Sequence, residues 1–103
     1  LGEGHPDTLR AYNDVGAALH RQGRSGEAIP LFEAALAGFR ASFGEAHAQT
    51  VTAHNNLCVL MGSLQRPSEA LPHCRQALAG ALEVFGAGHP SAIMVANSLA
   101  SVQ

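Results

Sequence analysis

The sequence predicts an all-α fold built from helical hairpins that follow one another along the chain. Two observations lead to this prediction. The sequence repeats itself with a period of 42 residues, and apolar residues within each unit recur three and four positions apart, which is the spacing of one face of an α-helix. The alternation of apolar and polar residues that would indicate strands is absent from the sequence.

The repeat is clearest where each unit starts. The stretches LGEGHPDTLRAYNDV, FGEAHAQTVTAHNNL and FGAGHPSAIMVANSL begin at residues 1, 43 and 85. They share a glycine, a histidine and an asparagine in register, which are Gly2, Gly44 and Gly86, then His5, His47 and His89, then Asn13, Asn55 and Asn97. We expect one domain over residues 1–103, with repeat 1 at 1–42, repeat 2 at 43–84 and a partial third repeat or terminal helix at 85–103.

Turn and capping residues predict where each helix begins and ends. The first hairpin is expected near 6–22 and 26–41, because Pro6 suits a first helical turn and Gly44 suits a left-handed cap after the second helix. The second hairpin is expected near 48–64 and 68–83, and a lone fifth helix from about 90. Gln65 stands where repeat 1 has the turn glycine Gly23, so the second turn is expected to be less favourable.

Two prolines disagree with uninterrupted helices. Pro30 and Pro72 fall at the same repeat position, about one turn into the second helix of each hairpin. Proline removes one backbone hydrogen bond and crowds the carbonyl four residues earlier. We expect both to be tolerated, with a slight bend or a later helix start.

Composition limits the possible functions. The net charge is −2, and all six basic residues are arginines scattered along the chain. A nucleic-acid binder needs a clustered basic footprint, so no nucleic-acid partner is expected. No apolar run approaches the ~20 residues that span a bilayer and no signal peptide is evident, so we expect no membrane partner and a cytoplasmic location. Because the sequence opens inside a motif without Met, it is expected to be a fragment of a longer protein.

Cys58 and Cys74 have three interpretations. They could form a disulfide, although small secreted domains that depend on such bonds usually carry more cysteines. They could bind a metal together with His73, although no CxxC or HxxxH pair is present and adjacent helical positions point in different directions. We expect free, buried thiols in a reducing compartment.

The segment NDVGAALHRQGRSGEAIPLFEAAL, at 13–36, resembles a tetratricopeptide repeat. The residues that carry the resemblance are Gly16, Leu19, Gly23, Glu27, Ala28, Phe32, Ala35 and Leu36. The long unit and the linker LGEGHPDTL resemble the kinesin-light-chain type of this repeat. The resemblance covers the whole chain and implies antiparallel hairpins stacked into a right-handed superhelical solenoid of about 2.5 repeats and five helices.

Small residues recur where helices of such an array approach closely. Gly16, Cys58 and Ala100 share one repeat position, where a small side chain lets neighbouring helices pack tightly. Cys74 aligns with Phe32, which is another packing position. The small size of the cysteines is therefore enough to explain their positions, without any role for their chemistry.

In this family the first helices of successive repeats line a concave groove that holds an extended peptide or a partner's helix. Carried across by position, the resemblance places the groove on one polar or small face of each first helix. Repeat 1 contributes Arg10, Asn13, Ala17, His20 and Arg21, repeat 2 contributes Thr52, Asn55, Val59, Gly62 and Ser63, and repeat 3 contributes Met94, Asn97 and Ser101.

The asparagine ladder of Asn13, Asn55 and Asn97 is the leading candidate for partner contact. Each amide offers a donor and an acceptor, so a row of them could pair with the backbone of an extended peptide. The alternative is that each asparagine bonds to the helix of a neighbouring repeat and only fixes the stacking.

Arg10, His20 and Arg21 add positive charge at one end of the expected groove. Such charge would suit an acidic peptide or a terminal carboxylate. The family's clamp for terminal carboxylates combines lysine with asparagine, and this sequence has no lysine. The alternative is that these charges are simply solvated.

The repeated histidines His5, His47 and His89 could suggest a metal ladder, but histidine at a helix start more often caps the helix. We expect this structural role, with no metal and no cofactor. The sequence contains no Ser/His/Asp order, phosphate-binding GxxxxGK[ST] loop or HExxH motif. We therefore expect no enzyme activity and no small-molecule substrate.

The last predicted helix is apolar on more than one side, through Ile93, Met94, Val95, Leu99 and Val102. A terminal repeat normally presents a polar outer face. Either a longer array continues beyond this chain, or a second copy covers the surface and makes a homo-oligomer.

These observations predict a protein–protein interaction module that binds a peptide or helix of a partner in its concave groove. The first alternative is a structural or self-assembly module that acts through the exposed terminal helix. The second is an accessory domain of a larger signalling protein.

Overall fold

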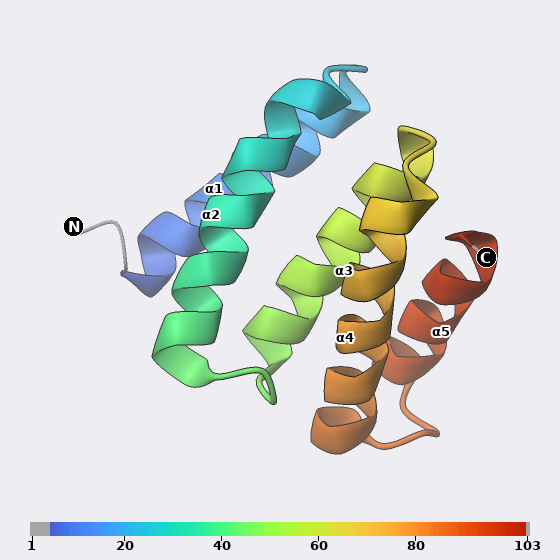
Figure 1. Ribbon diagram of the computed structural model, residues 1–103. Helices are drawn as coiled ribbons and strands as arrows, with labels where there is room; N and C mark the ends of the chain where they lie inside the picture. The colour runs from blue at the N-terminus through green and yellow to red at the C-terminus, as the bar shows by residue number, and fades with distance from the viewer. Residues whose placement is uncertain (1–4, 103) are drawn as a thin grey trace.

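A computed structural model describes residues 5–102 as five α-helices (Figure 1). The helices are α1 (Pro6–Arg21), α2 (Ser25–Phe43), α3 (Ala48–Ser63), α4 (Pro67–Phe85) and α5 (Pro90–Val102). The expected all-α repeat array is confirmed, and every predicted helix boundary lies within two residues of the observed one.

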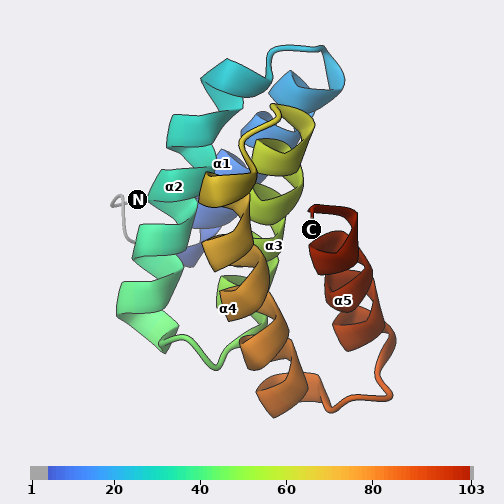
Figure 2. The same cartoon turned by 45° about the vertical axis from the view of Figure 1, so that its right-hand side comes forward.

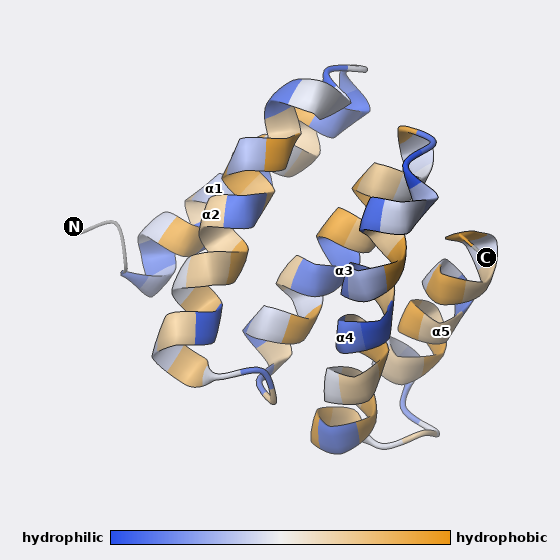
Figure 3. Ribbon diagram, in the orientation of Figure 1, coloured by the Kyte–Doolittle hydropathy of each residue, from blue (hydrophilic) through white to orange (hydrophobic). Residues whose placement is uncertain are grey.

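The helices form two layers, with α1, α3 and α5 in one and α2 and α4 in the other (Figures 1 and 2). Each hairpin packs its two helices against each other, and α3 and α5 also contact the second helix of the preceding hairpin. Polar residues gather at the turns between α1 and α2 and between α3 and α4, while apolar residues recur along the helices (Figure 3). The first helices α1, α3 and α5 therefore lie on the same side of the molecule.

The repeated histidines cap the helices that follow them, as expected. Each histidine Nδ1 accepts a hydrogen bond from the backbone N–H two residues later, which satisfies one of the free donors of the first turn. These bonds measure 3.1 Å for His5, 3.1 Å for His47 and 3.0 Å for His89. Phe43 and Phe85, the residues before each inter-hairpin loop, stack on His47 and His89 with ring centroids 4.2 and 4.7 Å apart. The caps therefore also hold the loops between hairpins.

Turn residues adopt positive φ angles where the chain reverses. Gly23, Gly44 and Gly86 have φ values of 78°, 82° and 88°, which glycine adopts without a Cβ clash. Gln65 takes the same role in the second hairpin with a φ of 59°. The weaker second turn expected from the sequence is thus a glutamine held in left-handed backbone.

The prolines lie inside intact helices. Residue Pro30 lies within α2 and Pro72 within α4. Because α2 begins at Ser25 and α4 at Pro67, the later helix start that the prolines suggested is wrong. Neither proline stops its helix.

Close approach within each hairpin occurs at the position predicted from the small residues. A Cβ on Gly16 would lie 2.8 Å from a ring carbon of Phe32, so the glycine makes room for the buried aromatic ring. At the equivalent positions of the second hairpin stand Cys58 and Cys74, and both are completely buried. The second hairpin therefore fills the same space with two cysteines.

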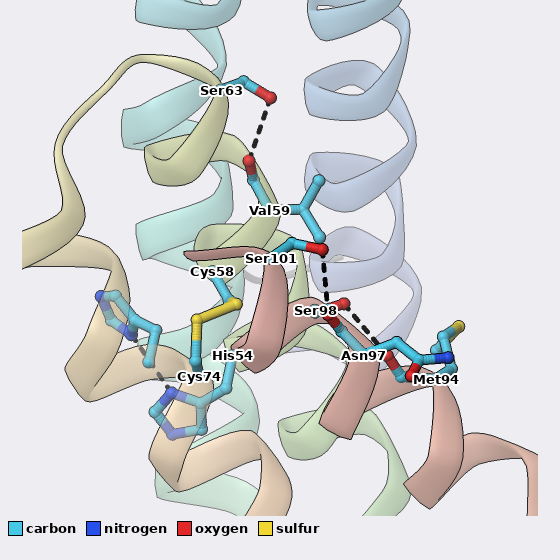
Figure 4. The surroundings of a disulfide bond; sticks show 10 residues. His54, Cys58, Val59, Ser63, Cys74, Met94, Asn97, Ser98 and Ser101 are labelled. Carbon is cyan, nitrogen blue, oxygen red and sulfur yellow. Dashed lines mark hydrogen bonds between the residues drawn. A yellow bond between two sulfur atoms is a disulfide. The ribbon is translucent and has the colours of Figure 1, made fainter. Parts of the chain in front are cut away.

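Cys58 and Cys74 form a disulfide bond between α3 and α4, with their Cα atoms 4.9 Å apart (Figure 4). The expectation of free thiols is wrong. The sequence placed both residues at packing positions, but only the pairing of α3 with α4 brings these two positions opposite each other. The disulfide accounts for both cysteines, so the interpretation as a metal site with His73 is not needed.

A polar network joins the two hairpins beside the disulfide. His54, which is 1% exposed, donates from Nε2 to Glu45 Oε2 at 2.9 Å. Its Nδ1 lies 3.2 Å from Nδ1 of His73 on α4, and Arg40 of α2 pairs with Glu45 and approaches His54 Nε2 to 3.3 Å. Helix α5 presents no titratable side chain over its described residues. Arg40, Glu45 and His73 are thus the charged or titratable groups that surround His54.

The two ring nitrogens that face each other need opposite roles. If both rings are neutral, or one carries an extra proton, one Nδ1 can accept from the other. If both rings are protonated, two donors face each other beside the Arg40 guanidinium. The contact is therefore lost when the pair takes up its second proton.

Burial favours the neutral rings. Desolvation is the main cause that lowers the pKa of His54, the Arg40 charge adds to it, and the bond to Glu45 opposes it. Desolvation also lowers the pKa of His73, with contributions from His54 and Arg40. Desolvation acts to raise the pKa of Glu45, but hydrogen bonds from His54 and Arg40 outweigh it and lower that pKa. Near neutral pH the network holds neutral imidazoles against an ionised carboxylate.

Reduction of the disulfide is expected to lower the free energy of unfolding by roughly 3 kcal/mol, because a bond that closes a loop of this length restricts the unfolded chain. Its partners are 16 residues apart. Denaturant titrations with and without reductant measure the difference. Alkylation of the denatured, unreduced protein should label neither cysteine, and full labelling without reductant would show that the bond does not form.

Replacing Gln65 with glycine is expected to raise the free energy of unfolding by roughly 0.5–1 kcal/mol, because the strain of left-handed backbone exceeds the added flexibility of the unfolded chain. The matched change Gly23→Ala at the equivalent turn should lower the free energy of unfolding by about 1 kcal/mol through backbone strain. A steric clash would not contribute, because no atom lies within 4 Å of a new Cβ there. Urea titration measures both, and equal effects of the same sign would contradict the explanation.

Acid should weaken the junction between the hairpins. Since the folded protein disfavours protonation of His54 and His73, the unfolded chain binds more protons below the ordinary histidine pKa of about 6.5. The contribution of these two histidines to the free energy of unfolding is fully present above that pH. It is lost as the pH falls toward their lowered pKa values in the folded protein. Glu45 stays ionised in this window because its pKa is also lowered.

The matched variant is His54→Tyr with His73→Leu, which installs the repeat-1 residues Tyr12 and Leu31. Between pH 7.5 and 5, the melting temperature of the wild type should fall further than that of the variant, by roughly 5 °C. The other histidines are common to both proteins and cancel in the comparison. Parallel pH profiles would exclude the His54–His73 pair as the cause.

Candidate partner-binding groove

The face formed by α1, α3 and α5 contains three hollows. One, of about 450 Å³, lies between α1 and α3 and is lined by Asp7, Arg10, Ala11, Asn13, Asp14, Ala17, Gln49, Thr52 and Asn56. The second, of about 330 Å³, lies between α3 and α5 and is lined by Val59, Gly62, Ser63, Ser98, Ser101 and Val102. The third, of about 550 Å³, lies along α5 and is lined by Pro90, Ile93, Met94, Asn97, Ser98 and Ser101. Together they form what is called the groove below.

Residues that are 42 positions apart line the groove as columns across the three helices. Two columns contain only residues predicted from the sequence, namely Arg10, Thr52 and Met94, and Ala17, Val59 and Ser101. A third column, of Asp14, Asn56 and Ser98, was not predicted. The sequence could have revealed this column, because all three residues are polar, occupy one repeat position and lie one turn from Arg10 and its equivalents.

The predicted asparagine ladder is only partly in the groove. Asn13 lines the α1–α3 hollow and Asn97 lines the hollow along α5. Asn55 is 8% exposed and lines none of the three hollows. Within the described residues, the Oδ1 atoms of Asn13 and Asn55 are buried without a hydrogen-bond partner. These two oxygens therefore make no hydrogen bond to a neighbouring helix, which the alternative interpretation of the ladder requires.

Hydroxyl groups in the groove use their protons internally. Each donates to the backbone carbonyl four residues earlier at 3.0–3.1 Å, and the donors are Thr52, Ser63, Ser98 and Ser101. Figure 4 shows the three serine bonds beside the disulfide. With the proton committed, the hydroxyl oxygen still has lone pairs that can accept from a partner.

The three predicted positive residues do not gather in the groove. Arg10 lines the α1–α3 hollow but pairs with Asp7. His20 lies at the turn between α1 and α2, where its Nδ1 is 2.7 Å from Ser25 Oγ. Arg21 is exposed at the end of α1 and lines none of the three hollows. A concentrated positive end, as expected from the sequence, is therefore not formed.

The apolar surface of α5 is smaller than the sequence suggested. Ile93 and Met94 are 51% and 53% exposed, but Val95 is 1% exposed in a cluster with residues of α3 and α4. Leu99 and Val102 are half-buried against the main core. The helical period turns Val95 toward α4, so a self-association surface on α5 has Ile93 and Met94 as its centre and cannot include Val95.

Within residues 5–102, no group of three or more His, Cys, Asp or Glu side chains is arranged to hold a metal ion. In the same part of the chain, none of the helices has the length and apolar character needed to cross a membrane. The groove itself carries side chains suited to hydrogen bonding and ion pairing.

Comparison with protein-family models gives two matches, both described as tetratricopeptide repeat. One covers residues 1–41 and the other residues 50–91. The first spans α1 and most of α2, and the second spans most of α3, all of α4 and the start of α5. Comparison with curated proteins finds no match.

Proposed function

We propose, since the chain belongs to the tetratricopeptide repeat family of protein–protein interaction modules, that this domain binds an extended segment of a partner protein in the groove. The observation that carries the proposal is the set of three columns of groove-lining residues on α1, α3 and α5. A surface that repeats in this way meets a partner that also repeats, such as a peptide backbone.

The dimensions agree with an extended partner. Packed helices have axes roughly 8–10 Å apart, and an extended chain advances roughly 3.3 Å per residue. Successive members of one column, which lie on successive helices, would then meet about every third residue of a bound segment. A rigid groove of this kind limits the ordering cost on binding, because its side chains are held by the helices before the partner arrives.

Asn13 is the amide best placed to contact the partner backbone. It lines the α1–α3 hollow, and no hydrogen bond within the described chain holds its Oδ1. If the amide turns toward the groove, a partner N–H would complete this buried acceptor, which is costly to leave unpaired. This favours the peptide-contact interpretation of the ladder at Asn13.

Self-assembly through α5 is the second candidate function. The exposed Ile93 and Met94 favour it, because adjacent large apolar side chains at a surface are typical of an interface. In this case the domain would act through its end, and the groove would be incidental. A role as accessory domain of a larger signalling protein is compatible with either surface.

The cellular compartment is still a prediction. The disulfide between Cys58 and Cys74 weighs against the expected cytoplasmic location, because such bonds persist mainly in oxidising compartments. The absence of catalysis and of a small-molecule substrate likewise remains an expectation.

The groove proposal predicts that Ala17→Arg, which fills the α1–α3 hollow, weakens partner binding at least about tenfold, or about 1.4 kcal/mol. The matched control is Ala37→Arg on the exposed side of α2, which should bind as the wild type does. Quantitative mass spectrometry of proteins captured from source cells gives candidates, and titration of each purified candidate gives the affinities.

Circular dichroism should first show that both variants are folded. Equal binding by the two variants would move the interaction away from the groove. Sedimentation of the wild type beside an Ile93→Ser, Met94→Ser variant then tests the second candidate. If the domain self-assembles through α5, the wild type should associate and the variant should stay monomeric.

A further inference from the structure

Four hydroxyl groups that line the groove offer a partner acceptors and no donors. Thr52, Ser63, Ser98 and Ser101 have committed their protons to carbonyls of their own helices. What these side chains offer to a partner is oxygen lone pairs. A partner that brings N–H groups therefore matches these four hydroxyls better than one that brings carbonyl or carboxylate oxygens.

The charge of the groove has the same preference. Among the residues that line the three hollows, the charged ones are Asp7, Arg10 and Asp14. Arg10 pairs with Asp7 one turn earlier, whereas Asp14 forms no ion pair within residues 5–102. One guanidinium among two carboxylates leaves the α1–α3 hollow negative, and the unmatched charge belongs to Asp14.

Asn13 and Asn56 line the same hollow as this unmatched carboxylate, from α1 and α3. A carboxylate without an ion-pair partner in such a hollow suits a guanidinium, which presents five donors in a plane and can bind a carboxylate through two of them. Lysine would bring the same charge but only a point contact.

The opposite end of the groove has different chemistry. The hollows at α5 are lined by serines and by apolar residues such as Val59, Ile93 and Met94. These three side chains are 41%, 51% and 53% exposed. An apolar side chain of a partner would remove them from water. The groove thus changes from acidic at α1 to apolar at α5.

We propose that the groove selects an extended peptide segment that carries an arginine for Asp14 at the α1–α3 hollow and an apolar side chain for the α5 end. This inference deepens the function proposed above and rests on it. It reverses the acidic-partner expectation, because the arginine that seemed to supply positive charge is neutralised by Asp7. An acidic segment would meet Asp14 and a row of oxygen acceptors.

Selection from a displayed library of random peptides tests this preference without a known partner. The immobilised proteins are the wild type, Asp14→Asn, the control Glu33→Gln on the exposed face of α2, and Ala17→Arg as the blocked groove. Asparagine keeps the shape of aspartate and removes only its charge.

Peptides enriched by the wild type, and absent with Ala17→Arg, should contain arginine roughly fivefold or more above the unselected library, with apolar residues on one side of it. A factor of this size is what one charge-assisted contact supplies at a partly exposed site. The enrichment of arginine should disappear with Asp14→Asn and persist with Glu33→Gln. Higher salt should reduce it.

The other outcomes distinguish the arginine preference, the role of Asp14 and groove binding itself. Peptides that depend on the open groove but show no arginine preference, or that favour Asp and Glu, would overturn this inference and leave groove binding intact. Arginine enrichment that survives Asp14→Asn would overturn the role of that carboxylate. A library with no peptide sensitive to Ala17→Arg would overturn the inference together with the proposed function.

Discussion

Close packing between the two helices of each hairpin is the constraint on which the other features depend. In the first hairpin the constraint is met by the absence of a side chain at Gly16, which gives Phe32 its place. In the second it is met by a covalent bond between Cys58 and Cys74. Both solutions place the second helix at a fixed distance and rotation relative to the first, so the outer face of the first helix is also fixed.

The groove follows from this arrangement without further specification. Because α1 packs on α2 and α3 on α4 through equivalent positions, and α5 packs on α4 and α3, residues 42 positions apart come to lie on the same face of successive helices. Asp14, Asn56 and Ser98 then form one column across the three helices. A substitution in one column should have little effect on the core, since the core uses the opposite face.

The two hairpins differ in how polar their junction is. Repeat 1 has Tyr12 and Leu31 where repeat 2 has His54 and His73. The histidine pair, with Glu45 and Arg40, links α2 to α3 and α4 through hydrogen bonds, which are sensitive to protonation in a way that apolar packing is not. The same substitutions that make the second repeat less regular also place two titratable rings in the junction between the hairpins.

The sequence by itself determined the helices, their order and their boundaries, because those depend on local spacing, prolines, glycines and histidine caps. It also determined two of the three columns of the groove through the repeat. Tertiary structure alone decided the disulfide, since Cys58 and Cys74 meet only when α3 and α4 pair, and it decided that Val95 is buried. It also formed the hollow between α1 and α3 that Asp14 lines. The pairing of Arg10 with Asp7, by contrast, is a contact between neighbouring turns of one helix, and it leaves Asp14 as the unmatched charge in that hollow.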